Sequence, residues 1–329
     1  MYGPLIRSLW AALLVVVGGS CATTHAQENG ARLLAPGVLT VIPPAAEKLE
    51  TVTGPVPIVE LVSGMPDLQW TPHYDPISNT LHEMAKRVIY RRKIWCLEFA
   101  FKPLRMIEVD IPQANGKMQR KLVWYLAYHV RNDGYDLNPK GTPDRWGHEV
   151  FDVEDDVTID PLRFFPHFVL GSVEFDKEYL DRLIPAAQRA IQDREKPGAG
   201  IRLFNSVEMT QQKIPLSDGR IDKSVWGVAT WEDVDPRIDF FSVFVRGLTN
   251  AFRFEDPPGA YQVGAPPGSG RVFSFKTLQL NFWRPGDALM EHEREIRFGV
   301  PVDPDPTAQQ EILNRFGLGE RLDHLWVYR

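Results

Sequence analysis

The sequence predicts a mainly β protein, an antiparallel β-sandwich of immunoglobulin-like type with a few inserted or flanking short helices. Three observations predict this fold. Segments with a hydrophobic period of two recur along the chain, short turns rich in Pro and Gly separate them, and segments with helical spacing are few. Of the 329 residues, 43% are hydrophobic and 24% are charged, which is the composition of a folded globular protein.

Residues 1–26 have the pattern of a signal peptide. Arg7 precedes an apolar run at 9–17, which is too short to span a bilayer, and Thr24-His25-Ala26 fits a small-x-small cleavage site. A competing interpretation is that Gly18-Gly19-Ser20-Cys21 is a lipobox and that Cys21 is lipidated. We therefore expect an exported protein, periplasmic or extracellular, that is lipid-anchored if Cys21 is the lipobox cysteine and has no transmembrane helix in the mature chain.

The mature chain is expected to have two parts. Residues 27–75 are Pro-rich and show no sustained period, which indicates an extended arm or linker. The β-sandwich domain is expected at 76–329, with two sandwiches at 76–215 and 216–329 as the alternative. A helix is predicted to begin at Asp75-Pro76. Its basic side chains at 86–93 favour a solvated face over a patch that binds an anionic surface.

The clearest strands follow at 94–132. In the segment 94–101, alternate apolar residues share one face, and a second alternating segment is centred on Val109. Asn115-Gly116 then predicts a tight hairpin turn before the strand Lys121–Asn132. Both faces of that strand are apolar, so it is expected at the centre of a sheet. Its predicted core face consists of Leu122, Trp124, Leu126, Tyr128 and Val130.

The remaining elements are predicted from shorter patterns. A helix that is kinked or divided at Pro185 is expected from Asp176 to Ile191, and a last helix at 307–316. Further strands are expected at 164–172, 201–210, 224–231, 239–247, 272–283, 293–298 and 325–328.

The segment 132–160 is the most polar part of the chain and is expected to be a weakly ordered surface loop. Calcium favours clustered carboxylate oxygens, but an EF-hand register begun at Asp136 fails at Lys140 and Gly147. A solvated acidic loop is the favoured interpretation, and an irregular calcium site is the alternative. That site would use Asp152, Glu154, Asp155 and Asp156.

Two tryptophans are candidate ligand platforms, because sugars stack on indole rings. Trp146 lies in the polar loop beside His148, and Trp231 precedes two acidic residues at the end of a predicted strand. The sequence therefore offers Trp146, His148 and Trp231 as ligand-binding candidates, against the competing interpretation that tryptophans in strand patterns belong to the core.

The net charge and the cysteine content exclude some kinds of protein. The net charge of −6 argues against a protein that binds nucleic acid, which needs a basic field. Cys96 is the only cysteine left after export, so no intramolecular disulfide is expected and Cys96 is predicted to be a strand-core thiol.

Three blocks of sequence carry a resemblance to a known group of proteins. They are WCLEFAFKPLRMIEVDIP at 95–112 with the strand that follows it, VWGVATWEDVDP at 225–236 and FFSVFVRGLTNAFRF at 240–254. In these blocks the chain resembles a family of uncharacterised exported bacterial proteins with an immunoglobulin-like β-sandwich. The resemblance implies a fold and export, and no activity, ligand or catalytic residue.

The sequence favours an exported cell-envelope protein that acts as a non-enzymatic structural or binding module, with an envelope protein or a glycan as partner. It contains no GxxxxGK, no GxSxG and no CxxC motif, so no residue is assigned a catalytic role. No cofactor is expected apart from the calcium alternative. The opposing hypothesis is a secreted hydrolase that uses carboxylates of the 132–160 loop.

Overall fold

The computed structural model describes residues 38–53, 59–60, 90–113, 115–147, 149–198, 200–218, 221–286 and 295–329; of residues 52–53, 90 and 152–157 it describes the backbone alone. The chain divides into two units, Met1–Gly30 and Ala31–Arg329, and all described residues belong to the second. The signal-peptide pattern with Cys21, the helix predicted at Asp75-Pro76 and His148 lie outside the described residues.

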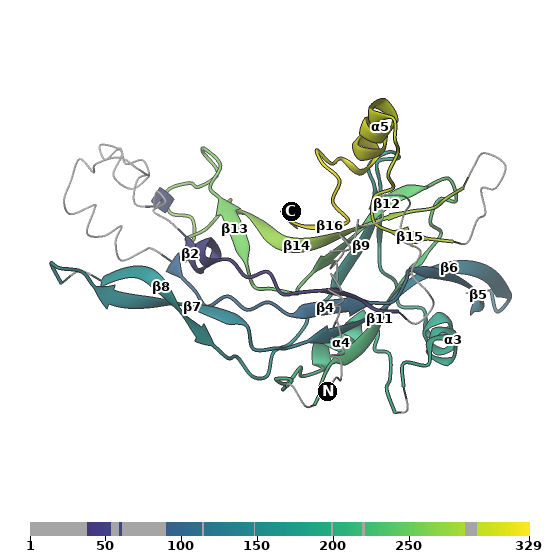
Figure 1. The fold of residues 1–329 in the computed structure, drawn as a ribbon, viewed down its shortest axis with the longest axis horizontal. Coiled ribbons are helices and arrows are strands. Elements are labelled where there is room, and N and C mark those ends of the chain that lie inside the picture. Colours follow the sequence, from purple (N-terminus) through teal and green to yellow (C-terminus); the bar gives the residue numbers. More distant parts are fainter. Residues whose placement is uncertain are drawn as a thin grey trace, which may run out of the picture. The chain divides into compact units, whose positions relative to one another are not determined.

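The described chain is mainly β, with antiparallel sheets and few helices (Figure 1). The first large sheet contains β1 (Thr40–Ile42), β4 (Glu98–Phe101), β5 (Arg105–Pro112), β6 (Met118–Arg131) and β11 (Val225–Glu232). The second contains β9 (His167–Ser172), β10 (Lys177–Leu180), β12 (Phe240–Arg246), β13 (Phe252–Glu255), β14 (Val272–Trp283), β15 (Arg297–Phe298) and β16 (His324–Tyr328).

Two small sheets and four helices complete the described elements. The small sheets pair β2 (Val52–Thr53) with β3 (Tyr90–Arg91), and β7 (Asp136–Pro143) with β8 (Glu149–Val157). The helices are the 3₁₀ turn η1 (Lys48–Thr51), α3 (Pro185–Glu195), α4 (Ser206–Gln211) and α5 (Pro306–Phe316). Within the described chain, no helix combines the length and the apolar character needed to cross a membrane.

Strand β6 lies at the centre of the first sheet, which confirms the prediction from its two apolar faces. β4 pairs with its C-terminal half, β5 pairs with its N-terminal half, and β11 pairs along Val123–Val130 on the other side. The predicted turn at Asn115-Gly116 joins β5 to β6, and Gly116 supplies its positive φ of 77°.

One hydrophobic core joins the two large sheets. The first sheet contributes Phe99 and Trp124, and the second contributes Phe168 and Leu278. β6 and β9, from the segment 76–215, pair with β11 and β12, from the segment 216–329. Each large sheet therefore contains strands of both segments, and both segments contribute residues to this core. Cys96 is 2% exposed, which confirms that it is a core cysteine, but it forms an isolated β-bridge with Thr249 and lies outside the strands.

The described part of the predicted arm is not an extended linker. Thr40–Ile42 forms β1 along the edge of β4, and Glu50 and Thr51 in η1 are buried. Apolar Ile42 joins the main core, so a segment without a sustained period is nevertheless held by tertiary contacts.

Three local predictions are wrong. The segment 132–160 contains the β7–β8 hairpin rather than a weakly ordered loop, because cross-strand backbone hydrogen bonds do not require apolar alternation. The strand predicted at 201–210 is replaced by α4, which Asn205 and Glu208 begin with a capping box. In the segment 176–191, the first part is strand β10, and Pro185 begins α3 instead of kinking a longer helix.

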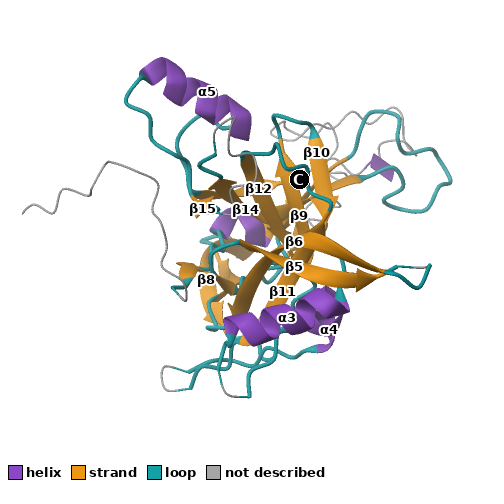
Figure 2. Ribbon diagram, turned by 90° about the vertical axis from the view of Figure 1, so that its right-hand side faces the viewer, coloured by secondary structure: helices purple, strands orange, loops and turns teal. Residues whose placement is uncertain are grey.

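Helices α3 and α4 lie beside β5, β6 and β11 (Figure 2). Ala187 and Ile191 of α3 pack with Val123 and Tyr125, which β6 directs away from the main core. The first sheet is therefore buried on both faces where α3 covers it, which explains why β6 is apolar on both sides.

Candidate binding cleft

A cleft of about 280 Å³ lies where the N-terminal arm meets the second sheet. We call it the arm cleft. Its lining residues come from the η1 turn and the residue before it, from Arg92 beside β3, from β13 and from β16. They are Glu47, Leu49, Glu50, Arg92, Phe252, Arg253, Phe254, Glu255 and Tyr328.

A Glu–Lys–Tyr cluster lies at the base of the arm cleft: Glu50 and Tyr328 line the cleft, and the buried Lys276 pairs with Glu50. The Glu50 carboxylate lies 2.5 Å from Lys276 Nζ, and the two side chains are 4% and 1% exposed. Tyr328 Oη donates a hydrogen bond of 2.6 Å to Glu50 Oε1, and the Glu47 amide donates one of 3.0 Å to Glu50 Oε2. The buried carboxylate and the buried ammonium are thus paired with each other, as buried charges must be.

The strands and the turn position these groups. Lys276 of β14 lies directly opposite Tyr328 of β16, so their side chains share one face of the second sheet. The η1 turn brings Glu50 onto this face, and Lys276 Nζ also donates a hydrogen bond to the Ala45 carbonyl. The cluster therefore fastens the N-terminal arm to the sheet.

The Glu–Lys–Tyr cluster is suited to hold the N-terminal arm on the sheet and poorly suited to transfer a proton. Burial, together with the hydrogen bond and the negative charge of Glu50, raises the pKa of Tyr328 well above its usual value. Tyr328 stays a protonated donor at ordinary pH. The Glu50 carboxylate already accepts three donors, which leaves it poorly suited to act as a general base.

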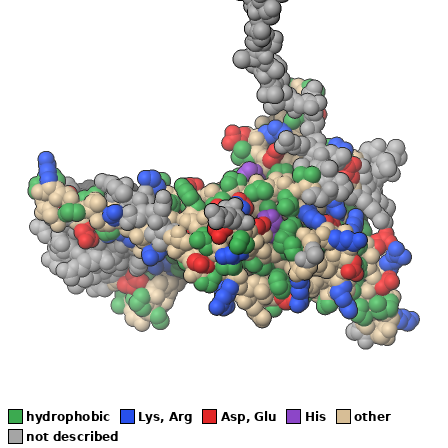
Figure 3. Space-filling model, turned by 60° about the horizontal axis from the view of Figure 1, so that its bottom comes forward, with side chains coloured by type: hydrophobic (Ala, Val, Ile, Leu, Met, Phe, Trp, Pro, Cys, Tyr) green, Lys and Arg blue, Asp and Glu red, His purple; other side chains and the backbone are tan. Residues whose placement is uncertain are grey.

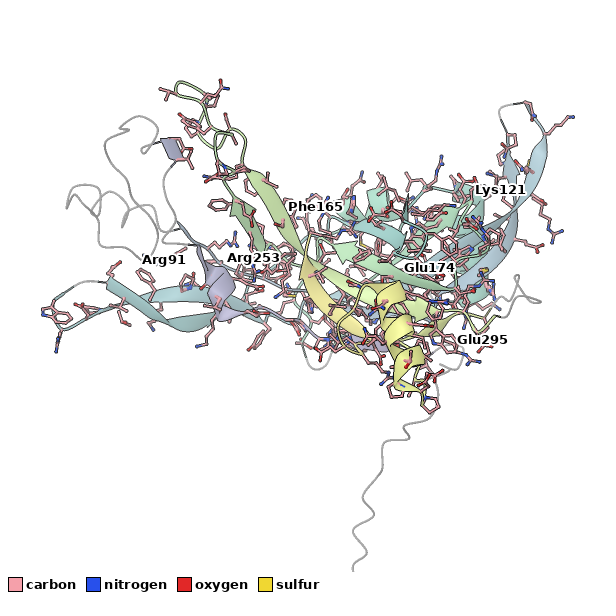
Figure 4. The ribbon with its side chains drawn as sticks, turned by 90° about the horizontal axis from the view of Figure 1, so that it is seen from above. Arg91, Lys121, Phe165, Glu174, Arg253 and Glu295 are labelled. Carbon is pink, nitrogen blue, oxygen red and sulfur yellow. The ribbon has the colours of Figure 1, made fainter. Side chains whose placement is uncertain are left out.

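Guanidinium groups and aromatic rings form the mouth of the arm cleft. The Arg92 guanidinium lies 3.8 Å from the Phe252 ring centroid, and its Nε donates a hydrogen bond of 3.1 Å to the Glu50 carbonyl. Partial burial lowers the pKa of Arg92, although the nearby Tyr328 and Glu50 oppose that shift. Arg253 is exposed and lies 3.8 Å from the Tyr328 ring centroid (Figure 4). A ligand that enters the cleft meets planar cations and ring edges.

The structure separates the predicted tryptophan platforms. Trp146, in the turn between β7 and β8, is 66% exposed, and the Arg145 guanidinium lies 3.7 Å from its ring centroid. Trp231 is 0% exposed and belongs to the main core, so it offers no exposed ring and that part of the prediction is wrong. The reason is that β11 directs Trp231 to the core face, opposite Trp124 of β6.

The acidic candidates lie on β8, at Asp152, Glu154, Asp155 and Asp156, where the structure describes the backbone alone. Over the part of the chain that the structure describes, no group of three or more His, Cys, Asp or Glu side chains is arranged to hold a metal ion.

Of the acidic residues at 132–160 whose side chains are described, Asp136 is the buried one. Asp136 Oδ2 accepts a hydrogen bond of 2.7 Å from the Ile159 amide, and burial raises the pKa of this carboxyl group. Asp133, three residues before it, is exposed. The hairpin therefore does not place these two carboxylates together in a buried pair.

A second ionic cluster attaches α3 to the first sheet. Glu195 accepts hydrogen bonds of 3.0 Å from Lys102 Nζ, 3.0 Å from Arg105 Nη1 and 2.7 Å from Tyr125 Oη. Burial alone would raise the pKa of Glu195, but the hydrogen bonds from Tyr125 and Lys102 and the charge of Arg105 outweigh burial and hold it below its usual value. A more open groove of about 590 Å³ lies nearby, between α3 and residues 200–203.

Sequence reasoning did not identify Glu50, Arg92 and Tyr328 as site residues, because they meet only through long-range contacts. Lys276 was a usable signal, since a lysine inside the apolar strand at 272–283 requires a buried partner. Basic and acidic side chains are interspersed on the face shown in Figure 3, so that face has no single-signed field.

In comparisons with known proteins, the chain matches no family model, no curated protein and no solved structure.

Proposed function

We propose that this chain is an exported, non-enzymatic binding module of the bacterial cell envelope, an immunoglobulin-like β-sandwich whose ligand occupies the arm cleft. One observation carries the proposal: the buried Glu50 of the cleft is held by three donors, while Arg253 stands exposed at its mouth over the Tyr328 ring. The cleft thus combines a hydrogen-bonded base with a polar and aromatic rim, and such placed polar groups are what orient a ligand in a pocket.

Export is supported by the signal-peptide pattern at residues 1–26. Mass spectrometry of the protein recovered from its native host should show a mature chain that begins at Gln27. A diacylglycerol-modified Cys21 at the terminus would instead make the protein a lipoprotein, and Cys21→Ala would then release it from the membrane.

To test the binding function, the exported protein is immobilised and envelope extract is passed over it, and the same protein is applied to a glycan array. We expect the wild-type protein to retain one envelope protein or one class of glycan, and Arg253→Gln to weaken that binding at least about tenfold, the effect of losing one well-placed charged contact. Arg120→Gln is the matched control, because Arg120 is a 72% exposed arginine on β6 that lies outside the cleft.

Equal retention by the wild-type protein and Arg253→Gln would show that the ligand binds elsewhere. The hydrolase hypothesis makes a different prediction: incubation with envelope glycans would release soluble fragments, and Asp136→Asn would abolish that release. Fragment release that depends on Asp136 would overturn the non-enzymatic proposal.

A further inference from the structure

Four phenylalanines form a ladder on one face of the β13–β14 hairpin. Phe252 lies directly opposite Phe275, and Phe254 lies opposite Phe273, so all four side chains share a face. Their ring centroids are 5.6 Å apart for Phe252 and Phe273 and 6.4 Å apart for Phe273 and Phe275. We call these four residues the phenylalanine ladder.

The ladder is exposed where two of its rings lie side by side. Phe273 is 48% exposed and Phe275 is 40% exposed, although both have the apolar character of core residues. A single exposed apolar residue on a domain surface is ordinary, whereas neighbouring exposed aromatic rings mark an interaction surface.

Arginines border the ladder. The guanidinium of Arg92 lies 3.8 Å from the Phe252 centroid, that of Arg246 lies 5.1 Å from the Phe275 centroid, and that of Arg271 lies 4.1 Å from the Phe254 centroid. Arg271 is paired with Asp256, and Arg92 lies near the negative charge of Glu50, whereas Arg246 has no ion pair with a carboxylate among the described residues. At Arg246 the border of the ladder therefore carries a positive charge that no described carboxylate pairs with.

Burial and the positive charge of Arg246 affect the pKa of His167. His167 lies opposite Arg246 in the pairing of β9 with β12. Its pKa is lowered first by burial and then by the positive charge of Arg246, with a smaller contribution from Arg329, while Asp181 opposes the shift. The positive charge of Arg246 thus acts on its cross-strand neighbour, within a chain whose net charge is −6.

We infer that the phenylalanine ladder docks a partner polypeptide that presents an apolar segment flanked by carboxylates. The inference rests on the proposed binding function and names the class of partner. Phe and Arg are the residue types enriched in the cores of protein interfaces, and guanidinium groups pair with carboxylates through bidentate hydrogen bonds. The rings of Phe273 and Phe275 contact other phenylalanines and the Arg246 guanidinium, which suits a partner that carries apolar side chains and carboxylates.

The test uses the full exported chain and three polymer probes: a random copolymer of glutamate and tyrosine, polyglutamate, and the polyuronate alginate. We expect the copolymer to bind most tightly, because it alone combines carboxylates with aromatic side chains on a polypeptide. Its binding should weaken as salt rises from about 0.1 M to about 1 M, over which the screening length falls from about 10 Å to about 3 Å.

Two variants measure separately what the phenylalanine rings and the arginine charge contribute to copolymer binding. Phe273→Ser with Phe275→Ser should weaken copolymer binding at least about tenfold, as for residues at the centre of an interface. Val272→Ser is its control, because Val272 is 56% exposed on the same strand and lies on the opposite face. Arg246→Gln should lower the affinity and flatten its salt dependence, with Arg120→Gln as its control.

Tighter binding of alginate than of the copolymer would overturn the inference in favour of an acidic glycan, and binding of no probe would overturn it outright. If the serine double variant does not fold, as judged by its thermal melt, Arg246→Gln and the salt series still decide the outcome. Envelope material that is retained equally by wild type and by a folded ladder variant would refute the ladder while leaving the binding function intact. Failure of the wild-type protein to retain any envelope material would refute the binding function itself.

Discussion

Gly227 of β11 lies directly opposite Tyr128 of β6, and the Tyr128 ring occupies the space where a side chain at position 227 would start. A Cβ atom added to Gly227 would lie 2.5 Å from Tyr128 Cζ and 2.7 Å from Met209 Cε. Both neighbours are fully buried in the main core, so neither can move into solvent. The absence of a side chain at Gly227 is what allows β11 to pair with the centre of the first sheet.

Gly227→Ala should therefore destabilise the protein by about 2 kcal/mol or more, the cost of overpacking a well-packed core. Chemical denaturation measures the change. Gly319→Ala is the control, since no atom lies within 4 Å of a Cβ built there, and its effect should be below about 0.5 kcal/mol. Similar unfolding midpoints for the two variants would mean that β11 does not pair closely with β6 at this point.

Trp124→Ala should destabilise the protein by about 3 to 5 kcal/mol, the usual cost of truncating a buried aromatic residue. Trp124 is 3% exposed and packs edge-on against Phe241 of the opposite sheet, with ring centroids 5.3 Å apart. Leu122→Ala, two residues earlier on the same face, should cost less than about 1 kcal/mol because Leu122 is 40% exposed. Urea titration of both variants checks the register of β6, and an effect below about 1 kcal/mol for Trp124→Ala would contradict it.

Glu195 should make stability depend on pH in the acidic range. Its folded pKa lies below the usual value, so its contribution is complete above the unfolded pKa of about 4.3 and is lost as the pH falls through the lower folded pKa. Glu195→Gln should flatten this acid dependence. At neutral pH the same variant should be destabilised by about 3 kcal/mol, because Lys102 is left buried without its counter-charge.

Urea unfolding at neutral pH and near pH 3 measures both effects of Glu195→Gln. Glu108→Gln is a suitable control, because Glu108 pairs with the 72% exposed Arg120 and ion pairs that reach solvent contribute little. An acid dependence as steep in Glu195→Gln as in wild type would show that other carboxyl groups cause it.

Cys96 should be inert in the native protein. Burial raises the pKa of its thiol to about 12, and the residue is 2% exposed, so little reactive thiolate forms near neutral pH. In a chain with Cys21→Ser, a thiol reagent should label Cys96 at the rate of global unfolding and at once in denaturant. Rapid labelling of the folded protein would mean that the 94–97 segment opens locally.

Calcium should have little effect on stability. A calcium concentration one hundred times the dissociation constant of a site that forms only in the native state would add about 2.7 kcal/mol and raise the melting temperature by several degrees. We expect a rise of less than about one degree at millimolar calcium. A clear rise that disappears in Asp155→Asn with Asp156→Asn would establish a calcium site on β8.

The sequence by itself determined the elements in which the local pattern and the tertiary environment agree. The alternation at 121–132 and the Asn115-Gly116 turn predicted β6 and its hairpin, because a residue period of two and a positive φ at glycine are local requirements. Two apolar faces on β6 also predicted its central position, since only a covered strand can bury both.

Only the tertiary structure decided the rest. The β7–β8 hairpin is held by backbone pairing that leaves no apolar period, and α4 follows from a short capping box within a segment that alternates like a strand. Trp231 was placed in the core by the register of β11 against β6. At the arm cleft, Glu50 contacts Lys276 and Tyr328, which lie more than two hundred residues later in the sequence. A contact over that separation depends on sheet packing rather than on any local pattern.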